Sequence, residues 1–168
     1  MLLIYCEFMN TAFLLTGGNL GDRLQHLQNA SDAIQRYGGI IQQRSSVYQT
    51  AAWGFRDQPD FYNQVLQIQT KLNADELMKV LLEIEKISGR KRDMKLGPRI
   101  IDIDILLMND LVYQSDTVII PHPHLAERRF ALTPLQEIAG EKIHPVLHKT
   151  INELLIECKD ELPVYKIS

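Results

Sequence analysis

Two aspartates, Asp102 and Asp104, interrupt the apolar residues 100–108. The segment is rich in β-branched side chains, a composition typical of a strand buried in a sheet. Side chains two positions apart on a strand point to the same face, with Cα atoms about 6.5–7 Å apart. Two adjacent carboxylates on a buried strand are costly unless a cation neutralises them. Because Mg²⁺ takes carboxylate oxygens and keeps positions for phosphate or water, the pair predicts a magnesium site.

A basic segment, residues 89–99, lies immediately before this strand. It reads Gly-Arg-Lys-Arg-Asp-Met-Lys-Leu-Gly-Pro-Arg and carries a charge of +4, whereas the whole chain carries −3. Positive charge this local favours one anionic ligand over a nucleic acid, which needs basic side chains spread across a face. Arg99 is the best positioned cation, because it opens the strand and its guanidinium suits bidentate contact with phosphate. The acidic pair and the basic segment together predict a polyphosphate substrate.

Each of these features also has a structural explanation. Asp102 and Asp104 could pair with neighbouring arginines, and most runs of charge are solvated surface loops. His122 and His124 could be a zinc pair, but no cysteine or third histidine stands at a ligand-like spacing, and a histidine that donates to a phosphate is at least as good an explanation. We favour metal and phosphate chemistry, because the acidic pair adjoins a basic segment that its flanking glycines would allow to close over a ligand.

A second pattern suits a flat ligand. After Gln58-Pro59-Asp60, the residues Phe61-Tyr62-Asn63 place an amide two positions from an aromatic ring. Such a pair can bind a heterocycle by stacking and hydrogen bonding, although most aromatic side chains belong to the core. Gly17-Gly18-Asn19 lacks the ending and the spacing of nucleotide-binding loops, so we interpret it as a turn that packs close to a ligand.

The composition is that of a soluble globular protein. With 168 residues, 45% hydrophobic and 23% charged, we predict one domain over residues 1–168, with residues 1–10 as a ragged N-terminal extension. Cys6 and Cys158 match no metal spacing and are predicted to be free thiols in a reducing cytosol. We find neither a signal peptide nor a stretch of membrane-spanning length. We therefore expect a cytoplasmic monomer that binds small molecules, and neither a membrane nor a nucleic acid.

The apolar pattern also predicts the elements that must position these residues. Strands are expected over residues 11–16, 40–50, 61–72 and 100–108, with helices over 20–37 and 73–88. Short strands at 111–113 and 118–120, short helical turns over 125–140 and a last helix from Thr150, capped by Glu153, should follow. The order β-α-β-β-α-β with additions predicts a ferredoxin-like α+β fold, an α-β-α sandwich whose mainly antiparallel sheet carries extra strands and a C-terminal helix.

Several blocks of the chain together resemble the hydroxymethyl-dihydropterin pyrophosphokinase family of the folate pathway. These blocks are Gly17-Gly-Asn-Leu20, Asp57-Gln-Pro-Asp-Phe-Tyr-Asn63, Gly97-Pro-Arg-Ile-Ile-Asp-Ile-Asp104, Pro121-His122 and Arg128-Arg-Phe130. The resemblance runs in order from about residue 11 to residue 156, and the block that ends at Asp104 is its most specific piece. It implies the same ferredoxin-like sandwich, two Mg²⁺ ions, and transfer of a pyrophosphoryl group from ATP to the hydroxymethyl group of a dihydropterin, with release of AMP.

The resemblance also implies roles for individual residues. Asp102 and Asp104 would hold both metals and, with three arginines of the basic segment, form the catalytic set. The residues expected to contact the triphosphate are Arg90, Arg92, Arg99, His122 and Arg128. The residues expected to form the pterin pocket are Thr50, Ala51, Trp53, Phe61, Asn63 and Phe130, with the two phenylalanines sandwiching the ring and the asparagine bonded to its edge.

The mechanism expected from these roles is in-line attack of the substrate hydroxyl on the β-phosphorus of ATP. One metal would bridge the α- and β-phosphates and the other the β- and γ-phosphates. A Mg²⁺-dependent nucleotide hydrolase is the nearest rival. A second rival function is that of a ferredoxin-like RNA-binding module, although such a module would need exposed stacking aromatics and dispersed basic charge. A third is that of a degenerate relative that binds pterin without turnover.

Overall fold

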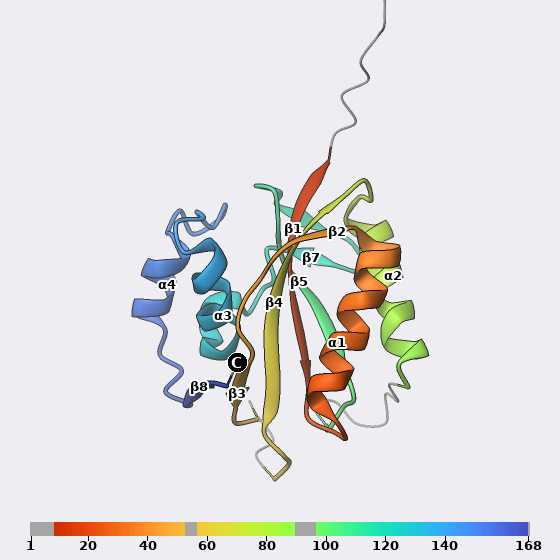
Figure 1. Cartoon of the computed structure of the whole chain (residues 1–168). Helices are drawn as coiled ribbons and strands as arrows, with labels where there is room; N and C mark the ends of the chain where they lie inside the picture. Colours follow the sequence, from red (N-terminus) through yellow and green to blue (C-terminus); the bar gives the residue numbers. More distant parts are fainter. Residues whose placement is uncertain (1–8, 53–56, 90–96, 168) are drawn as a thin grey trace, which may run out of the picture.

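The computed structural model of the chain describes residues 9–52, 57–89 and 97–167. A central sheet separates two layers of helices, with α1 (Arg23–Ala33) and α2 (Ala74–Ile87) on one face and α3 (Arg129–Ala139) and α4 (Ile151–Glu157) on the other (Figure 1). Two short turns complete the helical elements, a π-helical turn at Ile34–Gly38 and a 3-10 turn at Leu125–Glu127. The predicted α-β-α sandwich is confirmed.

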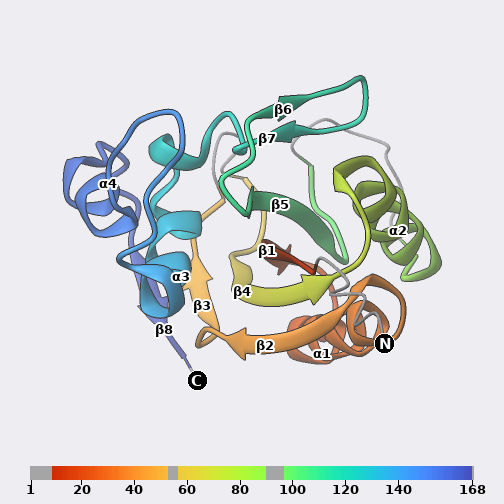
Figure 2. The ribbon, with the colours of Figure 1, turned by 90° about the horizontal axis from the view of Figure 1, so that it is seen from above.

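The main sheet is antiparallel throughout. Its strands are β1 (Asn10–Gly18), β2 (Ile40–Arg44), β3 (Tyr48–Thr50), β4 (Phe61–Thr70), β5 (Asp102–Met108) and β8 (Val164–Lys166). They lie in the order β5-β1-β4-β3-β8, and β2 pairs with the other half of β4 (Figure 2). With β2 and β3 taken together, the first five strands have the ferredoxin-like order that was predicted, and β8 is an extra edge strand.

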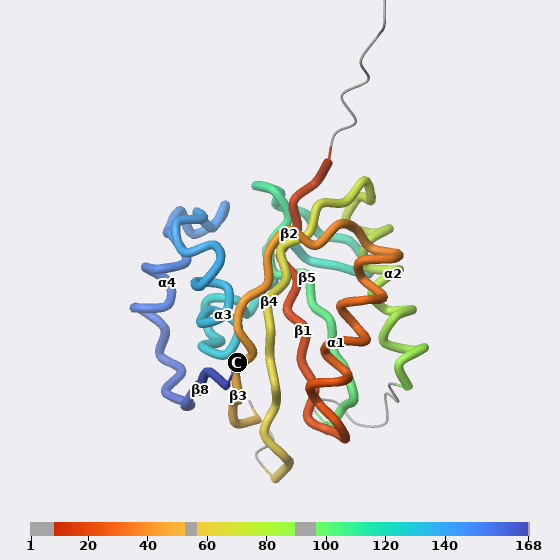
Figure 3. Tube along the Cα trace, viewed as in Figure 1, coloured from red at the N-terminus to blue at the C-terminus, as the bar shows by residue number. Residues whose placement is uncertain are grey.

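β1 lies inside the sheet, between β5 and β4, and is buried on both faces. Ala12 and Leu14 belong to the core beneath α1 and α2, whereas Phe13 and Leu15 belong to the core beneath α3 and α4. This two-sided burial explains why the strand is apolar at nearly every position. The trace in Figure 3 shows β4 and β5 on either side of β1, as the register of both pairs requires.

The same alternation decides where the acidic pair points. Ile103 and Ile105 of β5 are buried in the core shared with α1 and α2. Asp102 and Asp104 therefore face the side of the sheet on which α3 begins. The predicted strand over residues 100–108 is thus confirmed from Asp102 onward, and with it the prediction that both carboxylates share one face.

Capping residues start two of the helices as predicted. Asn73 and Glu76 form a capping box at the start of α2, and Thr150 and Glu153 form another at the start of α4. In each case the cap side chain and the glutamate reciprocally satisfy backbone N–H groups that the first turn would leave unpaired. The sequence therefore predicted both start points to the residue.

Four sequence-based details were wrong. The apolar stripe over residues 20–37 is incomplete, because Leu24 and Tyr37 are 50% and 61% exposed. Residues 40–50 form two strands, since the chain leaves the sheet between β2 and β3. The 111–113 strand is replaced by a separate hairpin of β6 (Tyr113–Gln114) and β7 (Ile119–Ile120). The short turns expected over 125–140 are mostly the regular helix α3, in which burial against the sheet outweighs the internal Pro134.

Two predictions about the chain as a whole can be compared with the structure. Cys158 is a buried free cysteine, and Cys6 lies outside the described residues. Among the helices of the described segments, none combines the length and the apolar character needed to cross a bilayer.

Candidate active site

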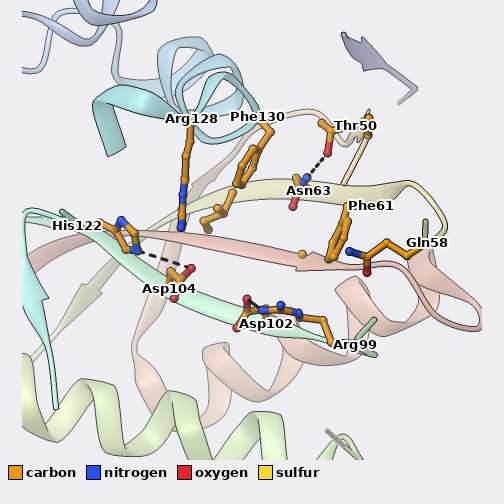
Figure 4. Close-up of a pocket in the computed structure, with 13 residues that line it drawn as sticks. Thr50, Gln58, Phe61, Asn63, Arg99, Asp102, Asp104, His122, Arg128 and Phe130 are labelled. Carbon is orange, nitrogen blue, oxygen red and sulfur yellow. Dashed lines mark hydrogen bonds and ion pairs between the residues drawn. The ribbon is translucent and has the colours of Figure 1, made fainter. Parts of the chain in front are cut away.

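A pocket of about 280 Å³ opens beside β5, where β1, β3, β4 and the start of α3 meet (Figure 4). Every predicted site residue in the described part of the chain lines it. The lining residues are Leu15, Gly17, Thr50, Ala51, Gln58, Phe61, Asn63, Arg99, Asp102, Asp104, His122, Arg128 and Phe130. Arg90, Arg92 and Trp53 lie outside the described residues, so their predicted roles stay predictions.

The backbone of β5 holds the two carboxylates at one edge of this pocket. Asp102 and Asp104 lie opposite Gly17 and Leu15 of β1, and their side chains are 24% and 31% exposed. Between them, the N–H of Ile103 donates to the buried carboxylate of Glu85 on α2 at 2.7 Å. This bond fixes the edge strand midway between the two aspartates. Sequence reasoning missed Glu85, whose only signal was an acid on the apolar stripe of a helix.

A basic side chain faces each aspartate from a different part of the chain. Arg99 donates to Asp102 in an ion pair, and the Arg99 side chain is 15% exposed. The imidazole Nε2 of His122 lies 4.0 Å from Oδ2 of Asp104, and the Arg128 charge also acts on both carboxylates. The structural alternative, pairing with a neighbouring arginine, is therefore realised at Asp102. Both carboxylates nevertheless line the open pocket, where an ion or a phosphate can reach them.

Burial changes the titration of the two basic groups opposite the acidic pair. It lowers the pKa of Arg128, an effect that Asp104 and Asp102 partly oppose. Burial, helped by the Arg128 charge, lowers the pKa of His122 to about 4. The imidazole is thus neutral at pH 7. Its Nδ1 accepts the backbone N–H of His124 at 3.2 Å, so Nε2 carries the proton and can donate into the pocket.

The other half of the pocket is a slot between two aromatic rings. Phe61 and Phe130 lie on either side of Asn63 in Figure 4. The Asn63 amide is 3% exposed and donates from Nδ2 to Oγ1 of Thr50 at 2.8 Å, which fixes its orientation. Gly17 is required beside it, because a Cβ there would lie 2.2 Å from Oδ1 of Asn63. Two rings and one immobilised amide are what a planar heterocycle needs.

Asn19 links this slot to the acidic strand, a role that sequence reasoning missed. Its buried side chain donates from Nδ2 to Oε1 of Gln58 and to the carbonyl of Pro59, both at 3.0 Å. Its Oδ1 accepts the backbone N–H of Arg99 at 2.8 Å. Three segments far apart in sequence therefore meet on one amide. The Gly-Gly-Asn turn indicated a close approach, but its partners depend on the tertiary fold.

A second depression, of about 270 Å³, adjoins the first and shares Asp104 and His122 with it. Its remaining lining residues are Met78, Ile105, Ser115, Asp116, Thr117, Val118, Ile119 and Pro123. The wall of this depression is the β6–β7 hairpin, which sequence reasoning did not connect with the site. The two cavities therefore meet at Asp104 and His122, with the aromatic slot in the first and the hairpin residues around the second.

One carboxylate of α2 accepts three hydrogen bonds from the hairpin segment. Asp75, in the first turn of α2, accepts from Oη of Tyr113 at 2.5 Å and from the hydroxyls of Ser115 and Thr117 at 2.6 Å each. These three donors lower the pKa of Asp75 to about 2, so its charge is permanent at physiological pH. The position of the hairpin is therefore set from α2.

The donor set at the acidic pair suits one class of metal. No group of three histidine, cysteine or acidic side chains that could hold an ion occurs in the described segments. This disfavours zinc at His122 and His124, because structural and catalytic zinc sites need three or four protein ligands. Mg²⁺ commonly takes one or two carboxylates and completes its shell with water and substrate phosphates. Asp102 and Asp104 beside an open pocket fit that requirement.

The family model described as 7,8-dihydro-6-hydroxymethylpterin-pyrophosphokinase (HPPK) matches residues 13–140. The chain belongs to the HPPK family. The matched segment runs from β1 through α3 and so contains every residue of the pocket described above. The predicted enzyme class, an ATP-dependent pyrophosphokinase, is confirmed by this membership.

Curated relatives agree with the assignment to HPPK. A 2-amino-4-hydroxy-6-hydroxymethyldihydropteridine pyrophosphokinase of Aquifex aeolicus is 41% identical over 145 residues, which are 86% of this chain and 90% of the relative. The Bacillus subtilis protein of the same name is 38% identical over 79% of this chain and 80% of the relative. A folic acid synthesis protein of Dictyostelium discoideum is 39% identical, but the chain spans only 22% of its length.

Solved structures support the fold. Wild-type Plasmodium falciparum HPPK-DHPS with STZ-DHP superposes with a TM-score of 0.70 at 19% identity, covering 89% of this chain and 41% of that chain. Identity this low carries the architecture alone. The ferredoxin-like sandwich that was predicted from the sequence is thus also the fold of an HPPK domain.

Proposed function

We propose that this HPPK transfers a pyrophosphoryl group from ATP to the hydroxymethyl group of 6-hydroxymethyl-7,8-dihydropterin, releasing AMP, in folate biosynthesis. Family membership supports the activity. So do two bacterial relatives that have this enzyme's name, because the match covers four-fifths or more of each relative. One observation carries the substrate assignment. The slot formed by two aromatic rings and the Asn63 amide lies in the same pocket as the carboxylates of Asp102 and Asp104.

The strand register supports a specific placement of the pterin. Asn63 of β4 and Asp102 of β5 both lie opposite Gly17 of β1, one on each side. Adjacent strands are about 4.8 Å apart, so the two residues are separated by about 10 Å across the sheet. A pterin stacked between Phe61 and Phe130, with its edge on Asn63, would then extend its hydroxymethyl group toward the acidic pair.

The phosphates would lie on the other side of the acidic pair. Arg99 and Arg128 supply guanidinium groups for the phosphate oxygens, and the neutral His122 can donate from Nε2 without a competing charge of its own. Arg90 and Arg92 remain predicted members of this set. The second depression, beyond His122, would take the nucleoside, since Met78, Ile105 and Val118 offer apolar contacts for a base and Ser115 and Thr117 offer hydroxyls.

Asp102 and Asp104 would hold the two Mg²⁺ ions. When bound, these ions would neutralise the phosphate chain and orient it for in-line displacement. The hydroxyl oxygen of the pterin forms a bond to the β-phosphorus as the bond from that phosphorus to the AMP oxygen breaks. Arg99 and Arg128 stabilise the charge that shifts to the departing AMP, and the hydroxyl proton is released.

Residues 1–168 are proposed to form one pyrophosphokinase domain that acts as a cytoplasmic monomer on small molecules. The single domain is supported by the described strands and helices, which form or pack on one six-stranded sheet, with the small β6–β7 hairpin packed beside it. Light scattering of the purified protein tests the monomer, and a dimer mass would contradict it.

Product analysis tests the activity. With 6-hydroxymethyl-7,8-dihydropterin, ATP and Mg²⁺, the protein should release AMP and a pterin diphosphate in equal amounts. Asp104→Asn should lower kcat by at least about 100-fold, because it removes one of the two carboxylates that we propose, among the described residues, to hold the metal at the phosphates. Asp32→Asn, an exposed acid on α1, is the matched control and should leave kcat unchanged. ADP, or AMP and free pyrophosphate without an acceptor, would indicate a hydrolase instead.

A further inference from the structure

A strap of residues 158–166 joins two walls of the pocket, the start of α3 and the strand β3. It leaves the end of α4, passes the first turn of α3 and ends as β8 on the edge of the main sheet (Figure 1). α3 carries Arg128 and Phe130 at its start, whereas β3, the neighbour of β8, ends at Thr50. The family match ends at residue 140, so the strap lies beyond the segment that defines the HPPK family.

Arg129 is the attachment point at the first wall. Its backbone N–H donates to Oδ2 of Asp160 at 3.1 Å. Its guanidinium donates from Nε to the carbonyl of Asp160 at 2.5 Å and from Nη2 to the carbonyl of Cys158 at 3.1 Å. The other carboxylate oxygen of Asp160 accepts the N–H of Leu162 at 3.1 Å, which turns the strap toward the sheet.

Asp160 also replaces a missing helix cap. Arg128 occupies the cap position of α3 and makes no capping hydrogen bond with its side chain, which lines the pocket instead. The carboxylate of Asp160 satisfies one of the free N–H groups of the first turn, and its negative charge is favourable at this end of the helix. The start of α3 is therefore stabilised from the strap.

The second wall receives the other end of the strap. Val164 lies opposite Thr50 in the β3–β8 pair, and the N–H of Ile167 donates to the carbonyl of Val47 at 2.9 Å. Thr50 in turn orients the Asn63 amide at the edge of the aromatic slot. The strap thus ends on the strand that fixes the slot's hydrogen-bonding group.

We propose that Arg129 and Asp160 are positioning residues for the pterin slot. They hold the first turn of α3, and hence Phe130, at the separation from Asn63 and Phe61 that a stacked pterin needs. Stacking is sensitive to ring separation, and a displaced wall would lower affinity for the flat ligand even in a folded protein. The inference rests on the proposed function, because it assigns the two residues to that substrate's site.

Pterin binding at a temperature well below the melting point tests the proposal. The dissociation constant of 6-hydroxymethyl-7,8-dihydropterin should rise about tenfold in Arg129→Ala and in Asp160→Asn, the loss expected from one or two hydrogen bonds. Asp160→Glu keeps two carboxylate acceptors and the charge, whereas asparagine keeps one acceptor for the N–H groups of Arg129 and Leu162, so the glutamate should recover part of the affinity. Exchange of the Arg129 amide hydrogen should accelerate in Asp160→Asn. If Arg129→Ala fails to fold, Asp160→Asn decides.

Glu157→Gln is the matched control. It removes one negative charge, as Asp160→Asn does, but Glu157 pairs with Lys149 on the exposed side of α4. It should leave the pterin dissociation constant unchanged. Wild-type affinity in Asp160→Asn, or an equal loss in Glu157→Gln, would overturn the positioning role. Absence of pterin binding by the wild-type protein would instead overturn the proposed function, so the two failures are distinguishable.

Discussion

Arg99 donates to Asp102, three residues further along the chain. We propose that Arg99 binds phosphate and that Asp102 binds metal, so the two proposed ligand-binding groups are paired with each other in the ligand-free protein. In the proposed reaction both groups would need new partners: Asp102 would help to hold a divalent ion, and Arg99 would turn toward the phosphates. The ion pair keeps two adjacent carboxylates from repelling one another without a ligand.

Removing Arg99 should move two measurements in opposite directions. In Arg99→Ala, Asp102 loses its competing cation, so Mg²⁺ alone should bind several-fold more tightly, as calorimetry without nucleotide would detect. Turnover should fall about 100-fold, because a guanidinium that stabilises transferring phosphate is lost. Arg36→Ala, which removes an exposed cation after α1, should change neither. Weaker Mg²⁺ binding in Arg99→Ala would show that the pair does not compete with metal.

Gly17 and Gly18 should respond differently to the same substitution. A Cβ at Gly17 would meet the end of the Asn63 side chain at 2.2 Å, whereas a Cβ at Gly18 would meet the backbone carbonyl of Ile100 at 2.1 Å. Gly17→Ala can be accommodated by displacing the amide, so pterin affinity should fall about tenfold while ATP affinity is kept. Gly18→Ala must displace backbone and should mainly lower the melting temperature. Equal effects of the two changes on pterin affinity would contradict this assignment.

His122 should titrate far below an ordinary histidine in the ligand-free protein. Burial lowers its pKa from 6.5 to about 4, so the unfolded chain binds more protons between those two values. The contribution of His122 to stability is therefore present above pH 6.5 and is lost as the pH falls toward 4, and it amounts to no more than about 3.5 kcal/mol. NMR titration of the ring should give the low midpoint. His122→Gln should flatten the acid side of the stability profile, and a midpoint near 6.5 would contradict the burial argument.

Sequence patterns predicted most of the residues that line the pocket, but they did not predict the long-range hydrogen bonds that fix its walls. The i, i+2 spacing of Asp102 and Asp104 specifies a shared face once the strand is recognised, and β5 is buried enough to be recognisable. The roles of Asn19 and Glu85 could not be predicted in this way. Each satisfies backbone groups of a segment far along the chain, and such pairing depends on the three-dimensional path. The same reason hid the Arg129–Asp160 contact, because nothing local indicates which helix start a distant carboxylate will cap.

The helix predictions failed where tertiary packing outweighed local pattern. Leu24 and Tyr37 fall at helical spacing but are exposed, since α1 buries a narrower stripe centred on Leu27, Ala30 and Ile34. α3 is continuous despite Pro134, because Leu132 and Leu135 are fully buried against the sheet. The helical spacing of apolar residues can be recognised in a sequence. The width of the helix face that the sheet will bury cannot be recognised in this way.

Asp75 should control nucleotide binding without touching the nucleotide. Its charged carboxylate holds Tyr113, Ser115 and Thr117 of the hairpin that walls the second depression. Asp75→Asn replaces a charged acceptor by a weaker neutral one, so the hairpin should loosen and KM for ATP should rise several-fold while KM for the pterin stays constant. Tyr113→Phe removes one of the three donors and should give a smaller effect in the same direction.

The pH dependence of the KM for ATP distinguishes a structural role of Asp75 from a role as a catalytic acid or base. Hydrogen bonding lowers the pKa of Asp75 to about 2, so the group keeps its charge from pH 5 to pH 9 and the ratio of the two KM values should be constant across this range. Asp110→Asn, which loses a surface contact with Lys142 in the turn after β5, is the matched control and should leave both KM values unchanged. A rise of the pterin KM in Asp75→Asn would mean that the hairpin acts on the whole site. The nucleoside would then have to be placed elsewhere than in the second depression.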